Sequence, residues 1–404
     1  MNPVIQFDSA KKINNNKASL FSAVSLFSGA GGMDVGFIDA GFQIEWANDF
    51  DKVAAETYRR NIGDHMVHGD INEYLDDLQK YSGVDCLFGG PPCQGFSIAG
   101  KMDLDDPRSQ LVKSFMQAVE IVRPRCFVME NVKALGSLSK FKSVRDELRS
   151  YADRLGYQTE LLMFNAKDFG VPQARARVFF VGYLNAKRLN FEARARAYFA
   201  PQVSTIQAIG HLGPQGSETN PQTCKAVVTL AANPIMRRSP YAGMLFNGAG
   251  RPINPNVPCA TLPASMGGNK TPIIDDRHYY GDGHSWVEEY HEHLMSGGTP
   301  YGTHDTPESI RRITLEEARI LHTFPNGYNF SGGMSATYRQ IGNAVPCGLA
   351  RAVARIAIDV LENRDVPEID ESQLSLTSCM RSGNSVLELS QKARYNPEEC
   401  GQHC

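Results

Sequence analysis

The sequence predicts an α/β protein with a doubly wound, mostly parallel sheet and a second, smaller and irregular domain. Two observations predict this fold class. From Ser22 to Tyr183, short apolar runs bounded by Gly-rich or acidic turns alternate with segments of helical period, which is the rhythm of strand–helix–strand units in a parallel sheet. In addition, the 404 residues exceed what one hydrophobic core usually supports.

The first domain is expected to contain regularly alternating elements. Strands are expected at 23–27, 44–47, 84–88, 126–129 and 177–183, and helices at 52–61, 109–122 and 141–155. In the helix from Ser109, apolar residues recur on one face, and Pro124 ends it.

After Tyr183 the regular pattern fails, and 185–306 is rich in Gly, Pro, Asn and aromatic residues, which predicts short strands and long loops. Helices are expected again at 315–322 and 346–361, the later one rejoining the first domain. We therefore expect a flexible leader (1–20), a catalytic domain (21–184), a second domain (185–330), a segment returning to the catalytic domain (331–362) and a polar tail (363–404).

The composition indicates which partners, cellular location and metal content to expect. The net charge of −3 gives no global sign of a polyanion partner. Nine cysteines without a C-x-x-C pair favour reduced thiols and a cytoplasmic location, and no stretch of about 20 apolar residues predicts a membrane span. The histidines between 278 and 293 and the cysteines at the end of the chain lack zinc-finger spacing, so we expect no metal.

A glycine-rich turn follows the first expected strand. It reads Phe27-Ser28-Gly29-Ala30-Gly31-Gly32, and its glycines allow a tight turn and close approach of a ligand. Glu45, expected to end the second strand, suits ribose hydroxyls; Trp46 suits a purine face, and Asp70 lies at another strand or loop end. These residues favour a nucleoside-bearing cofactor over a purely structural turn.

Three further motifs lie at the same edge of the sheet. Gly90-Pro91-Pro92-Cys93-Gln94-Gly95 follows the strand 84–88, so a thiol sits in a stiff loop where a core-filling role is unexpected and a nucleophile is favoured. Glu130, after the strand 126–129, suits an acid or a contact to a ring nitrogen, although a solvated strand-end carboxylate is as common. Arg175 and Arg177 form a cationic row for an oxo group or phosphate, or else a charged strand edge.

In their order along the chain and in their residues, these motifs closely resemble those of the cytosine-5 DNA methyltransferases. Two later blocks also match, Arg312-Ile313-Thr314-Leu315-Glu316-Glu317-Ala318-Arg319 and Tyr338-Arg339-Gln340-Ile341-Gly342-Asn343-Ala344-Val345-Pro346. The resemblance spans residues 23 to about 360 and implies a Rossmann-like S-adenosylmethionine-dependent methyltransferase domain with a target-recognition domain.

The resemblance implies a role for each catalytic residue. Cys93 would add to ring carbon 6 of cytosine, which makes carbon 5 nucleophilic enough to accept a methyl group. Glu130 would bind and protonate the ring nitrogen, Arg177 would contact the 2-oxo group, and Arg175 would lie beside the thiol and the developing charge. The target base must leave the duplex stack at a cost of a few kcal/mol.

The resemblance also implies binding residues. Those for S-adenosylmethionine are Phe27, Gly29, Gly31, Gly32, Glu45, Trp46, Asp70, Pro91, Asn343 and Val345. Those for DNA are Gln94 and Ser97 beside the nucleophile and the basic residues Arg237, Arg238, Arg251 and Lys270 of the second domain.

The implied partner is double-stranded DNA, bound by a monomer that acts either with a separate restriction endonuclease or as an unpaired host marker. A tRNA cytosine-5 methyltransferase is the nearest alternative, but that branch typically has Pro-Pro-Cys-Gln-Pro-Phe, whereas Gly95 follows Gln94 here, and a Cys-Phe-Thr block that this chain lacks. An inert DNA-binding partner is disfavoured because Cys93, Glu130 and Arg177 are all present.

Overall fold

The computed structural model describes residues 21–92, 107–185, 190–224 and 226–365, with the side chains of 107–109 left aside. A seven-stranded sheet has the order β3-β2-β1-β4-β5-β8-β6. Only β8 runs antiparallel to its neighbours β5 and β6. Its strands are β1 (Phe21–Leu26), β2 (Phe42–Asp49), β3 (Met66–His68), β4 (Cys86–Gly89), β5 (Cys126–Val132), β6 (Gln158–Asn165) and β8 (Ala176–Tyr183). The expected doubly wound, mostly parallel sheet is therefore confirmed.

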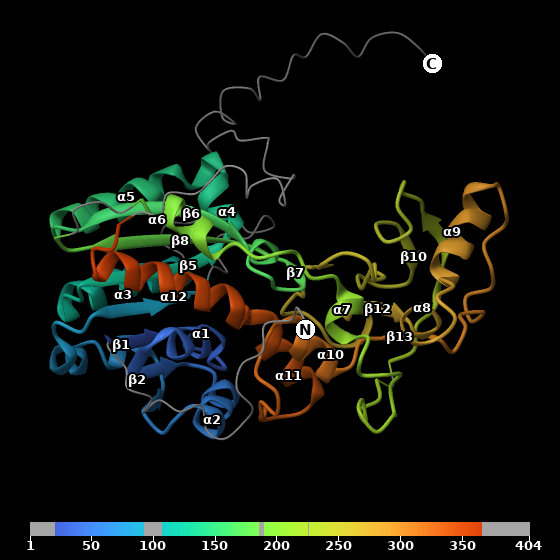
Figure 1. The fold of residues 1–404 in the computed structure, drawn as a ribbon, viewed down its shortest axis with the longest axis horizontal. Helices are drawn as coiled ribbons and strands as arrows, with labels where there is room; N and C mark the ends of the chain where they lie inside the picture. Colours follow the sequence, from blue (N-terminus) through green and yellow to red (C-terminus); the bar gives the residue numbers. More distant parts are fainter. Residues whose placement is uncertain (1–20, 93–106, 186–189, 225, 366–404) are drawn as a thin grey trace, which may run out of the picture.

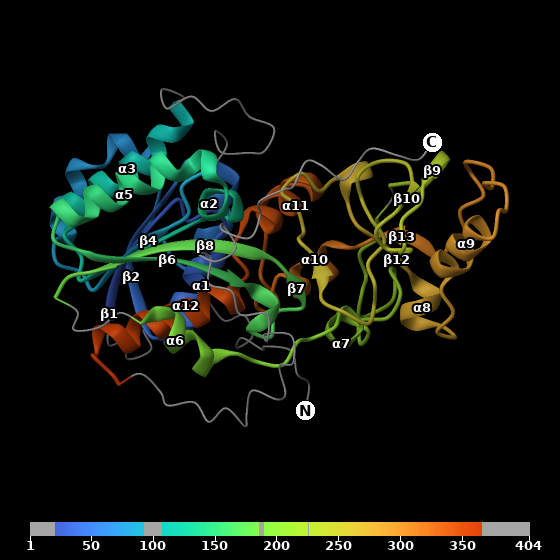
Figure 2. The same cartoon turned by 90° about the horizontal axis from the view of Figure 1, so that it is seen from above.

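Helices cover both faces of this sheet (Figure 2). One face packs against α1 (Gly32–Ala40), α6 (Phe191–Ala195) and α12 (Cys347–Leu361), and the other against α3 (Pro107–Val122) and α5 (Lys142–Arg154). The helix α2 is Lys52–Asn61, as the sequence predicts, and α4 is Lys133–Ser137. The glycine at position 36 lets α1 and α12 approach closely, because a Cβ there would lie 2.5 Å from the Arg351 backbone nitrogen.

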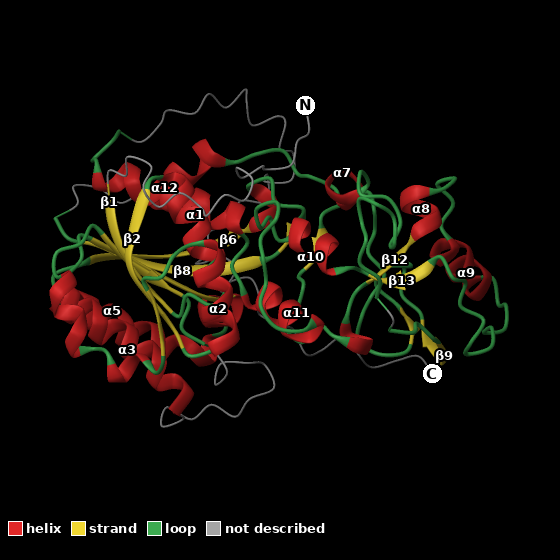
Figure 3. Ribbon diagram, turned by 90° about the horizontal axis from the view of Figure 1, so that it is seen from below, coloured by secondary structure: helices red, strands yellow, loops and turns green. Residues whose placement is uncertain are grey.

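The second lobe consists mainly of loops with short strands and helices (Figure 3). Its strands are β9 (Leu230–Ile235), β10 (Met244–Phe246), β11 (Cys259–Ala260), β12 (Ile273–Asp275) and β13 (Ile310–Arg312); its helices are α7 (Thr205–Ile209), α8 (Asp276–Tyr280) and α9 (Trp286–Met295). β11 pairs with β7 (Gln173–Ala174), so this lobe joins the segment that leads into β8.

The chain then returns to the sheet through α10 (Leu315–Leu321), α11 (Met334–Asn343) and α12 (Figure 1). The two late helices expected from the sequence correspond to α10 and α12, and the later one does rejoin the sheet, where its apolar residues enter the main core with those of α1. Among the described residues, no helix is both long and apolar enough to cross a bilayer.

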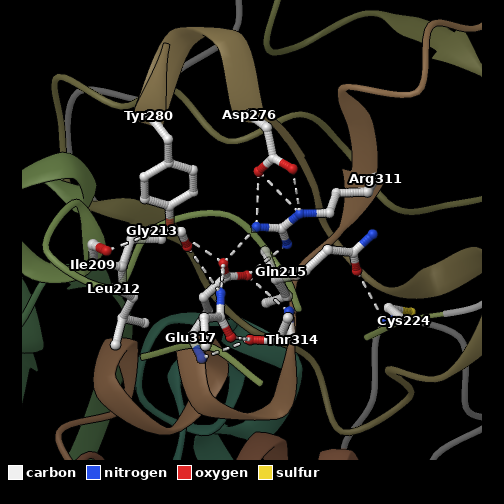
Figure 4. A network of polar contacts seen from close by, with 12 residues as sticks. Ile209, Leu212, Gly213, Gln215, Cys224, Asp276, Tyr280, Arg311, Thr314 and Glu317 are labelled. Atoms are coloured by element: carbon white, nitrogen blue, oxygen red, sulfur yellow. Dashed lines mark hydrogen bonds and ion pairs between the residues drawn. The ribbon is translucent and has the colours of Figure 1, made fainter. Parts of the chain in front are cut away.

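A buried ion-pair network fastens the second lobe to α10 (Figure 4). Arg311 lies between Glu317 of α10, at 2.7 Å, and Asp276 of α8, at 2.8 Å. The Glu317 side chain is fully buried and also accepts hydrogen bonds from Asn220 and Tyr280. Such a satisfied carboxylate fixes how the elements around it pack.

Candidate active site

The candidate site lies where parallel strands end, because parallel strands bring their carboxyl ends to one edge of a sheet. The glycine turn follows β1, Asp49 ends β2, Asp70 follows β3, and Pro91 follows β4. Glu130 lies close to the end of β5. The sequence motifs at these strand ends are thus gathered at one edge.

The glycine turn adopts conformations that favour glycine. Gly29 has φ 55° and Gly31 has φ 84°, and Phe27 also lies in the left-handed region at 54°. A Cβ on Gly32 would lie 2.7 Å from the Val345 carbonyl oxygen. The turn and the segment before α12 therefore meet, which brings together the predicted binding residues Gly32 and Val345.

The acidic residue at the end of β2 is Asp49. Its Oδ2 accepts a hydrogen bond from the Gly29 backbone N–H at 2.7 Å, and its Oδ1 accepts one from Asp51 at 2.7 Å. Burial raises the pKa of the Asp49 carboxyl, while these two N–H groups oppose the rise. Asp49 is thus fixed beside the glycine turn, and the next residue, Phe50, has a 75% exposed side chain.

The expectation that Glu45 ends the second strand is wrong, because β2 continues to Asp49. Glu45 is an exposed residue within the strand. Trp46 is buried, with its ring 6.3 Å from each of the rings of Tyr74 and Tyr81. Sequence reasoning therefore missed Asp49 and Phe50. The available signal was that they directly precede Asp51, whose side chain caps the first turn of α2.

Asp70 lies beside Asp49 at the neighbouring strand end. The Gly69 backbone N–H donates to the Asp49 carbonyl oxygen at 3.1 Å, and the Asp70 side chain accepts from the Asn72 backbone N–H at 3.0 Å. This part of the sheet edge thus carries the carboxylates of Asp49 and Asp70, the ring of Phe50 and the glycine turn.

Glu130 and Arg177 form an ion pair across β5 and β8, with Glu130 Oε1 2.7 Å from Arg177 Nε. Their side chains are 13% and 14% exposed, so the pair is partly shielded yet reachable. Burial raises the pKa of Glu130, and the charges of Arg177 and Arg175 oppose the rise. The environment therefore favours a protonated carboxyl more than water does, while Arg177 holds it in place.

The loop after β4 rests against this pair. A Cβ on Gly90 would lie 2.9 Å from Glu130 Oε2, so glycine permits the approach. Asn131 Nδ2 donates to the Pro91 carbonyl oxygen at 3.3 Å. The chain leading to Cys93 is thus held beside Glu130, whereas Cys93, Gln94 and Ser97 themselves lie outside the described residues.

Arg175 connects three segments of the molecule. It is 1% exposed and donates to the carbonyl oxygens of Leu262, in the second lobe, and Gly342, in α11, at 2.9 and 2.8 Å. Burial lowers its pKa well below the usual range. Gln173, the first residue of the same motif, is buried and within 3.0 Å of His322 Nδ1. Both side chains join the two lobes.

A family model of the C-5 cytosine-specific DNA methylases matches residues 21–358. The chain belongs to this family, and it is a DNA cytosine-5 methyltransferase.

Curated relatives of this methyltransferase are named Type II methyltransferases. The Type II methyltransferase M1.HphI of Haemophilus parahaemolyticus is 32% identical over 349 residues, covering 84% of this chain and 87% of that protein. The Type II methyltransferase M.NgoFVII of Neisseria gonorrhoeae is 31% identical over 379 residues, covering 89% and 94%.

Solved structures share the fold at lower identity. The S. pombe Dnmt2 methyltransferase has a TM-score of 0.59 at 17% identity, covering 85% of this chain and 98% of that chain. A Spodoptera frugiperda DNMT2 mutant has a TM-score of 0.60 at 17% identity, with 84% and 99% covered. At this identity the likeness concerns the fold alone.

The four basic residues expected to bind DNA in this methyltransferase are spread over the second lobe. Arg237 and Arg238 are exposed and follow β9. Arg251 is partly buried, and its Nη1 donates to the Gly248 carbonyl oxygen at 3.2 Å. Lys270 is exposed at the end of a short helical turn. These four residues are not grouped in the sequence, where only Arg237 and Arg238 are adjacent.

Proposed function

We propose that the protein transfers a methyl group from S-adenosylmethionine to carbon 5 of a flipped-out cytosine in a short, specific sequence of double-stranded DNA. The observation that carries the proposal is the Glu130–Arg177 pair, held 2.7 Å apart beside the loop that leads to Cys93. A carboxyl and a guanidinium side by side match the adjacent ring nitrogen and 2-oxo group of cytosine.

The first chemical step uses the chain's own residues. The Cys93 thiolate adds to ring carbon 6 while Glu130 delivers a proton to ring nitrogen 3, so the ring electrons move toward carbon 5 without building up negative charge. Arg177 binds the 2-oxo group and keeps Glu130 in position. Burial, which raises the pKa of Glu130, increases the fraction of the carboxyl that can donate this proton.

The later steps reverse the addition. Carbon 5 then accepts the electrophilic methyl group that bound S-adenosylmethionine would supply, and S-adenosylhomocysteine would be the leaving group. Removal of the carbon 5 proton by a base then restores the ring double bond, expels the Cys93 thiolate and releases the proton on nitrogen 3. Arg175 supports this pocket by holding the second lobe and α11 against the strand that carries Arg177.

The residues at the strand ends fit a nucleoside cofactor. A carboxylate has about four acceptor positions, and the two N–H groups that bind Asp49 leave it able to accept from ribose hydroxyls. Gly29 has open space where a Cβ would point, and Phe50 presents an exposed ring to a purine. We propose that Asp49 and Phe50 take the places assigned to Glu45 and Trp46. Phe27, Gly29, Gly31, Gly32, Asp70, Pro91, Asn343 and Val345 complete the cofactor site.

The relatives favour a restriction-modification role, because both are named Type II methyltransferases. We propose that 21–184 and 331–362 form the catalytic unit, that 185–330 recognises the target, and that the enzyme protects DNA in the cytoplasm as a monomer beside a separately acting restriction endonuclease. The family match to DNA methylases favours this over action on tRNA.

Covalent trapping tests the mechanism. A duplex with 5-fluorocytosine at the target should form a stable adduct with the enzyme in the presence of S-adenosylmethionine, because fluorine cannot leave carbon 5 as a proton does. The adduct should be absent with Cys93→Ser and with an unsubstituted duplex. A Cys93→Ser variant that still forms the adduct would contradict the assignment of the nucleophile.

A further inference from the structure

The antiparallel hairpin formed by β9 and β10 is buried at one end of its paired strands and exposed at the other. Leu230, Leu245 and Phe246 are buried in a small core with Val287 and Tyr290 of α9. This core belongs to the second lobe and is separate from the two cores that sandwich the main sheet. The hairpin therefore has a firm base of its own.

The end of the hairpin next to the loop that connects its strands presents apolar side chains to solvent. Ile235 is 50% exposed and Met244 is 38% exposed, and the two are direct partners across the strands. Arg237 and Arg238 follow Ile235 after one intervening residue and are exposed. Within the part of the chain that the structure describes, neither arginine has an ion-pair partner. Exposed apolar residues rimmed by unpaired arginines are typical of a binding surface.

Contacts from α9 hold the end of the hairpin. His291 Nε2 lies 2.8 Å from the Arg237 carbonyl oxygen, and the Tyr241 hydroxyl donates to Glu288 at 2.8 Å. Because the backbone at Arg237 is fixed, less conformational freedom is lost when its side chain binds a partner. Arg251, by contrast, uses part of its guanidinium on the carbonyl oxygen of Gly248.

The hairpin projects to the same side of the molecule as the first turn of α3, the helix that follows Cys93 in the chain (Figures 2 and 3). A duplex whose cytosine reaches the candidate site from that side can therefore also meet the hairpin. A two-stranded ribbon fits the major groove of B-DNA.

We propose that the β9–β10 hairpin enters the major groove and reads base edges, Arg237 and Arg238 by hydrogen bonds to guanine and Ile235 and Met244 by contact with a thymine methyl group. This inference rests on the proposed function of the protein as a sequence-specific DNA methyltransferase. It assigns sequence reading to the hairpin rather than to Arg251 or Lys270.

The arginines are tested by selecting bound duplexes from a randomised pool and sequencing them. Arg237→Ala and Arg238→Ala should each reduce the preference for guanine at one position by about 5- to 100-fold. Arg149→Ala, which removes an exposed arginine of α5, is the control and should leave the selected sequence unchanged. A uniform loss of binding, with a shallower salt dependence and unchanged sequence preference, would mean phosphate contacts and would overturn the proposal. Unchanged binding and preference would overturn it as well.

The apolar pair is tested with uracil in place of thymine, which removes only the methyl group. The wild-type protein should bind the thymine duplex more tightly at one position, and Ile235→Ser with Met244→Ser should abolish that difference. Equal binding of both duplexes by the wild-type protein would refute the methyl contact. Since the readout is bound sequence rather than methyl transfer, a protein that selects a sequence but transfers no methyl would refute the proposed function and still support the hairpin.

Discussion

The buried carboxylate of Glu317 offers a quantitative test of how α10 is fastened to the second lobe. It accepts five hydrogen bonds, two from Arg311 and one each from Thr314, Asn220 and Tyr280. In Glu317→Gln one side-chain oxygen becomes an NH₂ donor. Whichever way this amide is oriented, at least two of the surrounding donors lose their acceptor, and Arg311 keeps only Asp276 as an anionic partner.

The expected cost is about 3–5 kcal/mol of the free energy of unfolding, because at least two buried donors lose their acceptor and Arg311 loses one of its two carboxylate partners. At roughly 2 °C per kcal/mol this lowers Tm by about 6–10 °C. The chain has two tryptophans, Trp46 in the first lobe and Trp286 in the second. In a Trp46→Phe background, tryptophan fluorescence during guanidinium unfolding therefore reports on the second lobe.

The matched control is Glu147→Gln in the same background. Glu147 lies 3.8 Å from Lys113, and both side chains are 56% exposed. This exposed pair should contribute less than about 1 kcal/mol. If Glu317→Gln changes the unfolding free energy by no more than the control does, the network does not fasten the second lobe and the reasoning is refuted.

Four further predictions concern the site and its surroundings. Cys93→Ser should abolish methyl transfer but leave S-adenosylmethionine binding nearly unchanged in calorimetry, since Pro91 alone among the proposed cofactor residues shares the loop of the thiol; retained turnover would contradict this. Glu130→Gln should lower kcat by about 100-fold or more with little change in DNA affinity, because a general acid typically contributes that factor; an unchanged kcat would exclude the assigned role. Phe50→Ala should weaken S-adenosylmethionine binding by about 5-fold or more, as an aromatic stacking contact predicts, and equal affinity would remove Phe50 from the site. Burial raises the pKa of Asp34 to about 7, so the stabilisation from its protonation is complete below about pH 4 and is lost as the pH rises through 7. In urea unfolding measured from pH 4 to 8, the free energy of unfolding of the wild-type protein should therefore decline by up to about 4 kcal/mol through this group, and Asp34→Asn should remove that decline. An equal slope against pH in both proteins would refute the shift.

Elements with a clear period could be predicted from the sequence. The helix α2 begins and ends where expected, because Asp51 caps it and its apolar residues lie on one face. The helix α1 was not predicted. Its residues from Gly32 to Ile38 are all buried, so it has no polar face to mark a helical period. The helix α9 was not predicted either, because its buried residues are few and lie among acidic and histidine residues.

Site residues could be predicted where one short sequence motif contains them. They could be predicted less well where their position depends on which strands pair in the sheet. The end of β2 was placed too early because Asn48 and Asp49 are polar, but pairing with β3 continues the strand through both. The ion pair between Glu130 and Arg177 depends on the antiparallel register of β5 and β8, which joins residues almost 50 positions apart and leaves no local trace in the sequence.

The most direct test of the central claim is the transfer of labelled methyl groups from S-adenosylmethionine to unmethylated genomic DNA and to tRNA in parallel, followed by bisulfite sequencing of the DNA. The structure of the protein and its similarity to DNA methyltransferases predict that the label enters DNA, as 5-methylcytosine at one recurring short sequence. They predict no label in tRNA. Label in tRNA alone, or in neither nucleic acid, would contradict the claim.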